Sequence, residues 1–417
     1  MSGAQARRSA ALLALLVLGS ATVPAGAADD PALTRARALL GRTILIDGHN
    51  DLPWAIRSDK KAPGDIVAYD LRQRTSGQTD IARLREGRVG AQFWSVYIPG
   101  EMPAGLAHAQ LEQIDIARRI VARYPQDFAL AGTAQEVRAA HANGRIGSLL
   151  GIEGGHAIEN SLALLRTYYD LGVRYMTLTH NTHTDWADSA FQVPARHHGL
   201  TPFGEQLVGE MNRLGMLVDL SHTSEETMDD ALRVSRAPVI FSHSAARALC
   251  DVPRNVPDAI LRRLPENGGV VMVTFVAGFV DEAVAKVTLP AMMEYNLRSR
   301  SIAGEKERGA LFEEIFGKLK IPPTSIGKVA DHIEHVRKVA SVRNIGIGGD
   351  FDGNDHWPVG LSDVSMYPNL FAELIRRGWS DADLEALAGG NVLRAMEQAE
   401  AVSAQLRRTT EASIAKP

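Results

Sequence analysis

The chain has a single cysteine, Cys250, among its 417 residues. A lone cysteine excludes a disulfide within the chain, and it lies too far along to carry a lipid next to an export signal. The last six residues, 412–417, lack the hydrophobic tail of a lipid-anchor signal. We therefore expect neither a disulfide framework nor a membrane anchor.

Positive charge is not in excess. The chain has 45 Lys and Arg against 49 Asp and Glu, a formal net charge of -4. Because residues 1–27 contain Arg7, Arg8 and no acid, their removal would leave -6. This balance excludes the basic surface of a nucleic-acid-binding protein. The composition, 45% hydrophobic and 23% charged, is that of an ordinary globular protein.

The N-terminal segment resembles an export signal. Arg7 and Arg8 precede an apolar run from Ala10 to Leu18, which is too short to span a bilayer, and small residues follow at 25–27. We expect residues 1–27 to be a signal peptide and the protein to be periplasmic or secreted. A buried N-terminal helix is the alternative. The paired arginines also permit twin-arginine export without establishing it.

Eight apolar segments predict strands: 43–47, 89–97, 146–152, 173–179, 216–220, 238–241, 269–275 and 344–348. Segments with helical spacing lie between them, as at 104–123, 161–171, 202–214 and 326–342. This alternation favours an α/β fold, a (β/α)8 barrel over residues 28–400, followed by a polar tail at 401–417. The long connection 277–324 is open to three interpretations: a lid, a subunit contact or an extra helical hairpin.

Polar residues with metal-binding side chains follow the predicted strands. His49 and Asp51, two residues apart, can share one face of a strand and bind one ion together. Glu153, His222 and His243 follow three further strands. In a barrel, these strand ends meet at the face where catalytic groups gather.

Three imidazoles and two carboxylates suit zinc, although manganese or cobalt could use the same donors. Glu153 is the natural bridge between two ions about 3.5–4 Å apart, which could hold a hydroxide between them. The ordinary alternative for each Ser-His pair is a hydrogen-bonded structural histidine. We expect His156 to have a supporting role and Asp47 to make a structural hydrogen bond. Of Asp350 and Asp352, we expect Asp350 to take part in the chemistry.

Seven segments together resemble the renal or membrane dipeptidase family. In chain order they are 46–51 (IDGHND), 151–156 (GIEGGH), 177–181 (TLTHN), 219–222 (DLSH), 241–244 (FSHS), 254–258 (RNVPD) and 348–353 (GGDFDG). They occur in the family's order, and the resemblance covers the chain from about residue 43 to 397. Animal members use disulfides and a lipid anchor, which this chain cannot match.

The resemblance implies a binuclear zinc dipeptidase on a metal-dependent hydrolase barrel, acting on small dipeptides with free termini. It assigns His49 and Asp51 to one zinc ion, His222 and His243 to the other, and Glu153 to both. It also places His180 near the scissile carbonyl, Arg254 at the substrate carboxylate and Asp350 as the proton-transferring acid. A homodimer is consistent with the same resemblance.

Two other functions remain open. A related binuclear amidohydrolase could cleave a lactam, a lactone or an N-acyl amino acid with the same metal site, and dependence on Arg254 would separate it from a dipeptidase. An exported peptide-binding protein without turnover should have two similar lobes around a hinge. The single barrel-like alternation argues against it.

Overall fold

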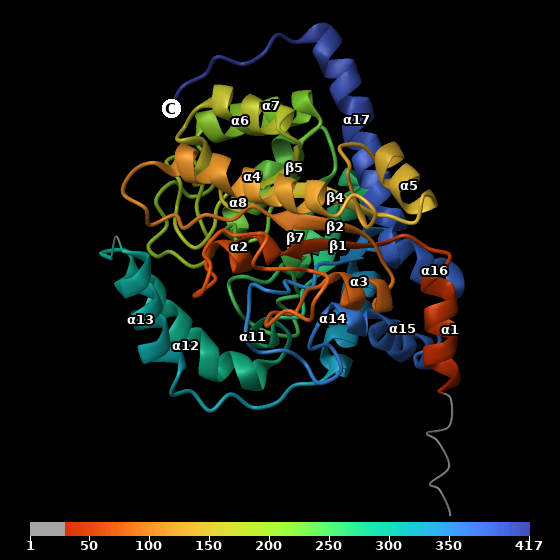
Figure 1. The fold of residues 1–417 in the computed structure, drawn as a ribbon. Helices are drawn as coiled ribbons and strands as arrows, with labels where there is room; N and C mark the ends of the chain where they lie inside the picture. Colours follow the sequence, from red (N-terminus) through yellow and green to blue (C-terminus); the bar gives the residue numbers. More distant parts are fainter. Residues whose placement is uncertain (1–29, 303) are drawn as a thin grey trace, which may run out of the picture.

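The computed structural model describes residues 30–417 except residue 303 (Figure 1), so the predicted signal peptide, 1–27, lies outside the described residues. The strands are β1 (Leu45–Asn50), β2 (Val89–Ser95), β3 (Phe128–Leu130), β4 (Ile146–Ile152), β5 (Val173–Thr177), β6 (Leu217–Asp219), β7 (Val239–Ser244), β8 (Val270–Val273) and β9 (Ile345–Ile347). All strand pairings are parallel, in the order β2-β1-β9-β8-β7-β6-β5-β4-β3. Parallel pairing of β2 with β4 closes the barrel.

The α-helices surround this barrel, as Figure 1 shows. Their bounds are α1 (Pro31–Leu40), α2 (Leu52–Arg57), α3 (Ile81–Glu86), α4 (Leu106–Arg123), α5 (Ala134–Ala142), α6 (Leu162–Asp170), α7 (Pro202–Leu214), α8 (Glu225–Val234), α9 (Asp258–Leu261), α10 (Leu264–Asn267), α11 (Ala277–Val280), α12 (Glu282–Ser299), α13 (Glu305–Phe316), α14 (Ile326–Val339), α15 (Tyr367–Arg376), α16 (Asp381–Glu385) and α17 (Asn391–Thr409). Short 3-10 helices lie at η1 (Gly155–Ile158), η2 (Val342–Asn344) and η3 (Val364–Met366), and a π-helix at η4 (Ala386–Gly390).

The predicted (β/α)8 barrel is confirmed. Each of the eight predicted strands corresponds to a barrel strand, and the boundaries differ by a few residues. The additional strand, β3, was not predicted because three residues are too few for an alternating pattern. It pairs with the first half of β4, from Phe128 opposite Ile146 to Leu130 opposite Ser148.

Local sequence determines where several helices begin. The side chains of Thr133, Ser161, Thr201 and Ser224 each accept a hydrogen bond from a backbone N–H in the first turn of the helix that follows. Such a cap satisfies a donor that has no partner within the helix. These caps fix the points at which the chain leaves the strand-end loops and turns back along the barrel.

Two large apolar clusters hold the barrel together. One joins barrel strands to the surrounding helices and includes the buried Trp94, Phe128 and Phe241. The other joins strand residues such as Phe93 and Tyr175 to α17. The polar site lies at the strand ends of a scaffold that is rigid because of this packing.

The connection 277–324 contains a helical hairpin, α12 and α13, which extends to one side of the barrel in Figure 1. Tyr295 of α12 packs edge-on against Phe312 of α13, with ring centroids 5.6 Å apart. Within the predicted polar tail, residues 401–409 form the end of α17, and Leu406 of this segment is buried.

Within residues 30–302 and 304–417, no helix combines the length and the hydropathy needed to cross a membrane.

Candidate metal centre and active site

The structure brings the predicted site residues together at the carboxyl ends of the barrel strands. Their donor atoms form three overlapping groups, each with all donor atoms within 4.8 Å of one another. The groups are His49, Glu153 and His243; Glu153, His180 and His222; and His49, Asp51 and Asp350. Residues from β1, β7 and the loops after β1, β4, β5, β6 and β9 therefore form one centre.

Glu153 lies in the middle of this centre. Its Oε1 atom is 3.0 Å from Nε2 of His222 and 3.3 Å from Nε2 of His243. Its Oε2 atom is 3.5 Å from Nε2 of His49. The two oxygens of one carboxylate thus face two different sets of imidazoles.

His49 and Asp51 form the second half of the centre. Nε2 of His49 lies 3.3 Å from Oδ2 of Asp51 and 3.9 Å from Oδ1 of Asp350. The predicted proximity of His49 and Asp51 therefore holds, although β1 ends at Asn50 and Asp51 begins the turn into α2. Gly353 allows the close approach of the acids, since a Cβ there would lie 2.3 Å from Asp51 Oδ2 and 2.7 Å from Asp350 Oδ1.

All three predicted ligand histidines have their other ring nitrogen, Nδ1, held by the protein. For His49 the partner is the hydroxyl of Tyr175 at 2.9 Å, and for His222 it is Oδ1 of Asn181 at 3.1 Å. Nδ1 of His243 lies 2.8 Å from the Ser242 hydroxyl. Partners at Nδ1 orient an imidazole so that Nε2 faces a metal.

Burial governs the protonation of the centre. It holds the pKa values of His180, His222 and His243 well below the ordinary value, which leaves these imidazoles neutral. Burial also raises the pKa of Glu153, and it raises that of Asp350 well above the usual range, where nearby carboxylates act in the same direction. Neutral imidazoles are the form that binds metals.

The residues present fit a divalent metal centre. Nε2 of His49 is fully buried and has no hydrogen-bond partner. Burial alone would lower the pKa of this imidazole, but Tyr175, Asp51 and Glu153 raise it well above its usual value. Burying several carboxylates without enough cations around them destabilises the fold, and a bound metal ion would offset their negative charge. Nitrogen and oxygen donors of this kind match zinc or a similar ion.

Arg254 is completely buried below the site. Its guanidinium donates to the Ser244 hydroxyl at 2.7 Å and to the backbone carbonyl of His243 at 2.8 Å, while its Nε–H has no partner. The guanidinium also lies 5.6 Å from the centre of the Phe279 ring. Burial lowers the pKa of Arg254 to about 10, which still leaves the group charged at neutral pH.

His180 and Asp350 lie at the open side of the centre, where their side chains are 15% and 14% exposed. His180 Nε2 is 3.8 Å from Oε1 of Glu153. Asp350 and His222 have backbone φ angles of 65° and 66°, in the left-handed region that few residues other than glycine adopt. Such backbone positions concentrate at functional sites.

The residues judged structural from the sequence have the expected contacts. Asp47 accepts hydrogen bonds from the backbone of His49 and Gly349 and from the side chains of Gln92 and Tyr367. Asp352 accepts from the backbone N–H of Gln78. Nε2 of His156 lies 2.9 Å from the carbonyl of Ile98, which is a supporting contact outside the three groups of donors.

Sequence reasoning missed Tyr97, which follows β2. Its ring packs edge-on against His180, with centroids 4.9 Å apart, and against Trp54 at 5.0 Å. The sequence signal was its place at a strand end, the same signal that identified the histidines. Tyr97 did not stand out because an aromatic residue at that position also fits a buried strand.

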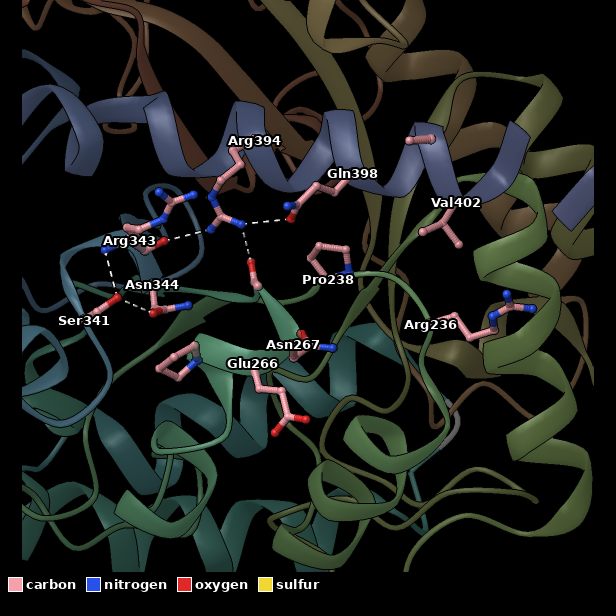
Figure 2. Close-up of a pocket in the computed structure, with 13 residues that line it drawn as sticks. Arg236, Pro238, Glu266, Asn267, Ser341, Arg343, Asn344, Arg394, Gln398 and Val402 are labelled. Atoms are coloured by element: carbon pink, nitrogen blue, oxygen red, sulfur yellow. Dashed lines mark hydrogen bonds between the residues drawn. The ribbon is translucent and has the colours of Figure 1, made fainter. Parts of the chain in front are cut away.

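A cavity of about 490 Å³ lies at the opposite end of the barrel (Figure 2), lined by residues that precede β7, β8 and β9 and by α17. Arg394 in its wall donates to the carbonyls of Gly268 and Arg343 and to the side chain of Gln398. These bonds tie α17 to the barrel. Because the metal-binding side chains meet at the other end, we place the active site there.

The fold and the site define a (β/α)8 barrel protein with metal-binding side chains at the carboxyl ends of its strands. The model of the family described as membrane dipeptidase (peptidase family M19) matches residues 33–410. The chain is 42% identical over 382 residues to Dipeptidase 3 of Rattus norvegicus, covering 90% of this chain and 69% of that protein. The chain therefore belongs to the membrane dipeptidase family and is a metallo-dipeptidase.

Solved structures agree with this assignment. The probable dipeptidase PvdM from Pseudomonas aeruginosa superimposes with a TM-score of 0.76 at 25% identity, over 89% of this chain and 99% of that one. A metallo peptidase from Rhodobacter sphaeroides, liganded with a phosphinate mimic of the dipeptide L-Ala-D-Ala, gives a TM-score of 0.67 at 25% identity. The superposition covers 86% of this chain and 99% of that structure.

Proposed function

We propose that this protein hydrolyses the peptide bond of dipeptides with free termini, using two zinc ions. His49 and Asp51 hold one ion, His222 and His243 hold the other, and Glu153 is shared. The main support for this proposal is the position of the two Glu153 oxygens. Oε2 lies near Nε2 of His49, and Oε1 lies near Nε2 of both His222 and His243.

When bound, the two ions would supply a hydroxide nucleophile and positive charge beside the scissile carbonyl. Asp350 takes the proton from the attacking group and returns it to the leaving amine. Burial raises the pKa of Asp350, which makes its carboxylate a stronger base for this exchange. His180, neutral because it is buried, donates a hydrogen bond to the oxyanion.

Arg254 recognises the free carboxylate of the substrate. A guanidinium has five N–H donors, and here the hydroxyl of Ser244 and the carbonyl of His243 use two of them. The unpartnered Nε–H supports a remaining role as a donor. A free carboxylate also matches the planar fork of a guanidinium.

The Glu153→Gln variant tests the shared site. The amide keeps the shape of the side chain but loses the charge, so we expect both metal content and dipeptide hydrolysis to fall. Glu210→Gln is the matched control, because Glu210 is also buried but pairs with Arg166 and Arg213 away from the centre. Elemental analysis and kcat/KM on the same samples decide the outcome. Two metals and full activity in Glu153→Gln would refute the proposal.

A second candidate is a related amidohydrolase that cleaves a lactam, a lactone or an N-acyl amino acid. The favouring observation is the complete burial of Arg254, which bonds to β7 rather than facing solvent. Arg254→Ala separates the dipeptidase from an enzyme that acts on a lactam or a lactone without a free carboxylate. If Arg254 reads a carboxylate, the variant loses activity on free dipeptides but keeps it on a lactone without that group.

We also infer that the protein is exported, periplasmic or secreted, and can form a homodimer. The arginine pair and apolar run of residues 1–27 support export. The family resemblance alone supports the dimer.

A further inference from the structure

Asp219, at the end of β6, contacts both segments that carry the Ser-His pairs. It is fully buried. Its Oδ1 atom accepts hydrogen bonds from the backbone N–H of Ser221 at 3.1 Å and of Ser242 at 2.8 Å. These two serines immediately precede His222 and His243. One carboxylate oxygen therefore ties together the backbones from which two predicted ligands project.

The other oxygen of Asp219 binds hydroxyl groups. Oδ2 accepts from Thr177 Oγ1 at 2.5 Å and from Ser242 Oγ at 2.6 Å. Asp219 thus receives four hydrogen bonds, and its capacity as an acceptor is used within the protein. The hydroxyl hydrogen of Ser242 points to Asp219, because a carboxylate oxygen only accepts, whereas the imidazole Nδ1 of His243 can donate. The contact of this hydroxyl with Ser221 Oγ is longer, at 3.5 Å.

The direction of this hydrogen bond determines the tautomer of His243. A serine hydroxyl has one hydrogen, and Ser242 uses it on Asp219. In its 2.8 Å contact with Nδ1 of His243, the hydroxyl must therefore accept. Nδ1 then carries the imidazole proton, which leaves Nε2 as the nitrogen that can bind a metal. Nε2 lies 3.3 Å from Glu153 Oε1 and 3.0 Å from Nε2 of His222.

We propose that Asp219 is the positioning residue of the His222–His243 half of the centre. It sets the spacing of the two strand ends through Oδ1, and through the Ser242 hydroxyl it fixes the tautomer in which His243 can bind a metal. Partners beyond the ligands typically contribute about 10- to 100-fold to metal affinity. This inference rests on the proposed metal-dependent function.

The test compares three variants by zinc affinity, measured by competition with a chelator. We expect Ser242→Ala to weaken zinc binding about tenfold and Asp219→Asn about 100-fold. Thr177→Val is the matched control, because it removes a hydroxyl from the same Asp219 oxygen without touching a predicted ligand histidine. Its affinity should stay within about threefold of the parent, below the range for partners that orient a ligand.

A second readout reports the tautomer itself. Proton NMR of the zinc-loaded protein should show a slowly exchanging imidazole N–H of His243 in the parent and in Thr177→Val, and its loss in Ser242→Ala. Equal affinities for Ser242→Ala and the parent, or equal losses for Ser242→Ala and Thr177→Val, would overturn the inference alone. A parent protein that binds no zinc would overturn the proposed function as well. If Asp219→Asn does not fold, the comparison of Ser242→Ala with Thr177→Val still tests the inference.

Discussion

The hydroxyl of Tyr175 lies 2.9 Å from Nδ1 of His49, joining the middle of β5 to the end of β1. The same hydroxyl donates to the carbonyl of Gly48 at 3.1 Å. A carbonyl only accepts, so the tyrosine accepts from Nδ1–H of His49. Nε2 of His49 is then the nitrogen that faces the centre and is left to bind a metal.

Tyr175→Phe should therefore weaken metal binding, because His49 loses the partner that holds its ring and tautomer. We expect roughly tenfold lower zinc affinity, measured by chelator competition. Tyr168→Phe is the control, since the buried Tyr168 also donates to a carbonyl, that of Ala157, away from the site. It should cost about 1 kcal/mol of stability without changing zinc affinity. Unchanged affinity in Tyr175→Phe would contradict the argument.

Gly353 is the second position at which a small change should have a large effect. A methyl group there would overlap Asp51 and Asp350, so Gly353→Ala must move at least one of the two carboxylates. A displacement of about 1 Å can cost roughly 100-fold in rate, and we expect a loss of this order in kcat/KM. Gly209→Ala is the control, because nothing lies within 4 Å of the added atom in α7. Gly353→Ala with parental kcat/KM would show that the acids do not need this close approach.

The sequence predicted those site residues that lie at strand ends. Barrel closure turns a strand-end position into proximity, so His49, Glu153, His222 and His243 could be grouped without any knowledge of pairing. Asp219 was harder to identify, because at the end of a buried strand its contacts depend on the registry of β5, β6 and β7.

Tyr175 was missed for a different physical reason. It lies in the middle of β5 and looks like an ordinary core residue. Its position depends on Gly151 of β4, where a Cβ would lie 2.0 Å from the tyrosine ring. The contact between this glycine and the tyrosine depends on how the two neighbouring strands are aligned. That alignment cannot be read from the residue pattern of one strand alone.

Export can be tested through residues 1–27. We expect the protein expressed with its full sequence in a bacterial host to reach the periplasm and to begin at Ala28, which intact mass measurement would check. Replacing Arg7 and Arg8 with lysines separates the routes, since only twin-arginine export needs the arginine pair. A cytoplasmic protein that retains residues 1–27 would contradict the signal-peptide prediction.

His332 of α14 makes the stability of the fold dependent on pH, independently of the metal centre. Its Nδ1 accepts from the backbone N–H of Ala246 at 3.0 Å, and its Nε2 lies 3.2 Å from the carbonyl of Val280. The imidazole must be neutral to make both bonds. Burial lowers its pKa to about 4, from an ordinary value of 6.5.

The direction of the pH effect follows from this shift. The pKa is lower in the folded state than in the unfolded chain, so the contribution to stability is complete above about pH 6.5 and is lost as pH falls toward 4. Between pH 7.5 and pH 5, His332 should account for about 2 kcal/mol of lost stability. His332→Asn, measured by urea unfolding, should flatten the pH dependence by that amount, although the variant is less stable at pH 7.5. His108→Asn is the control, since it replaces a histidine whose side chain is 80% exposed. If His332→Asn keeps the parental dependence of stability on pH, the dependence arises from a group other than His332.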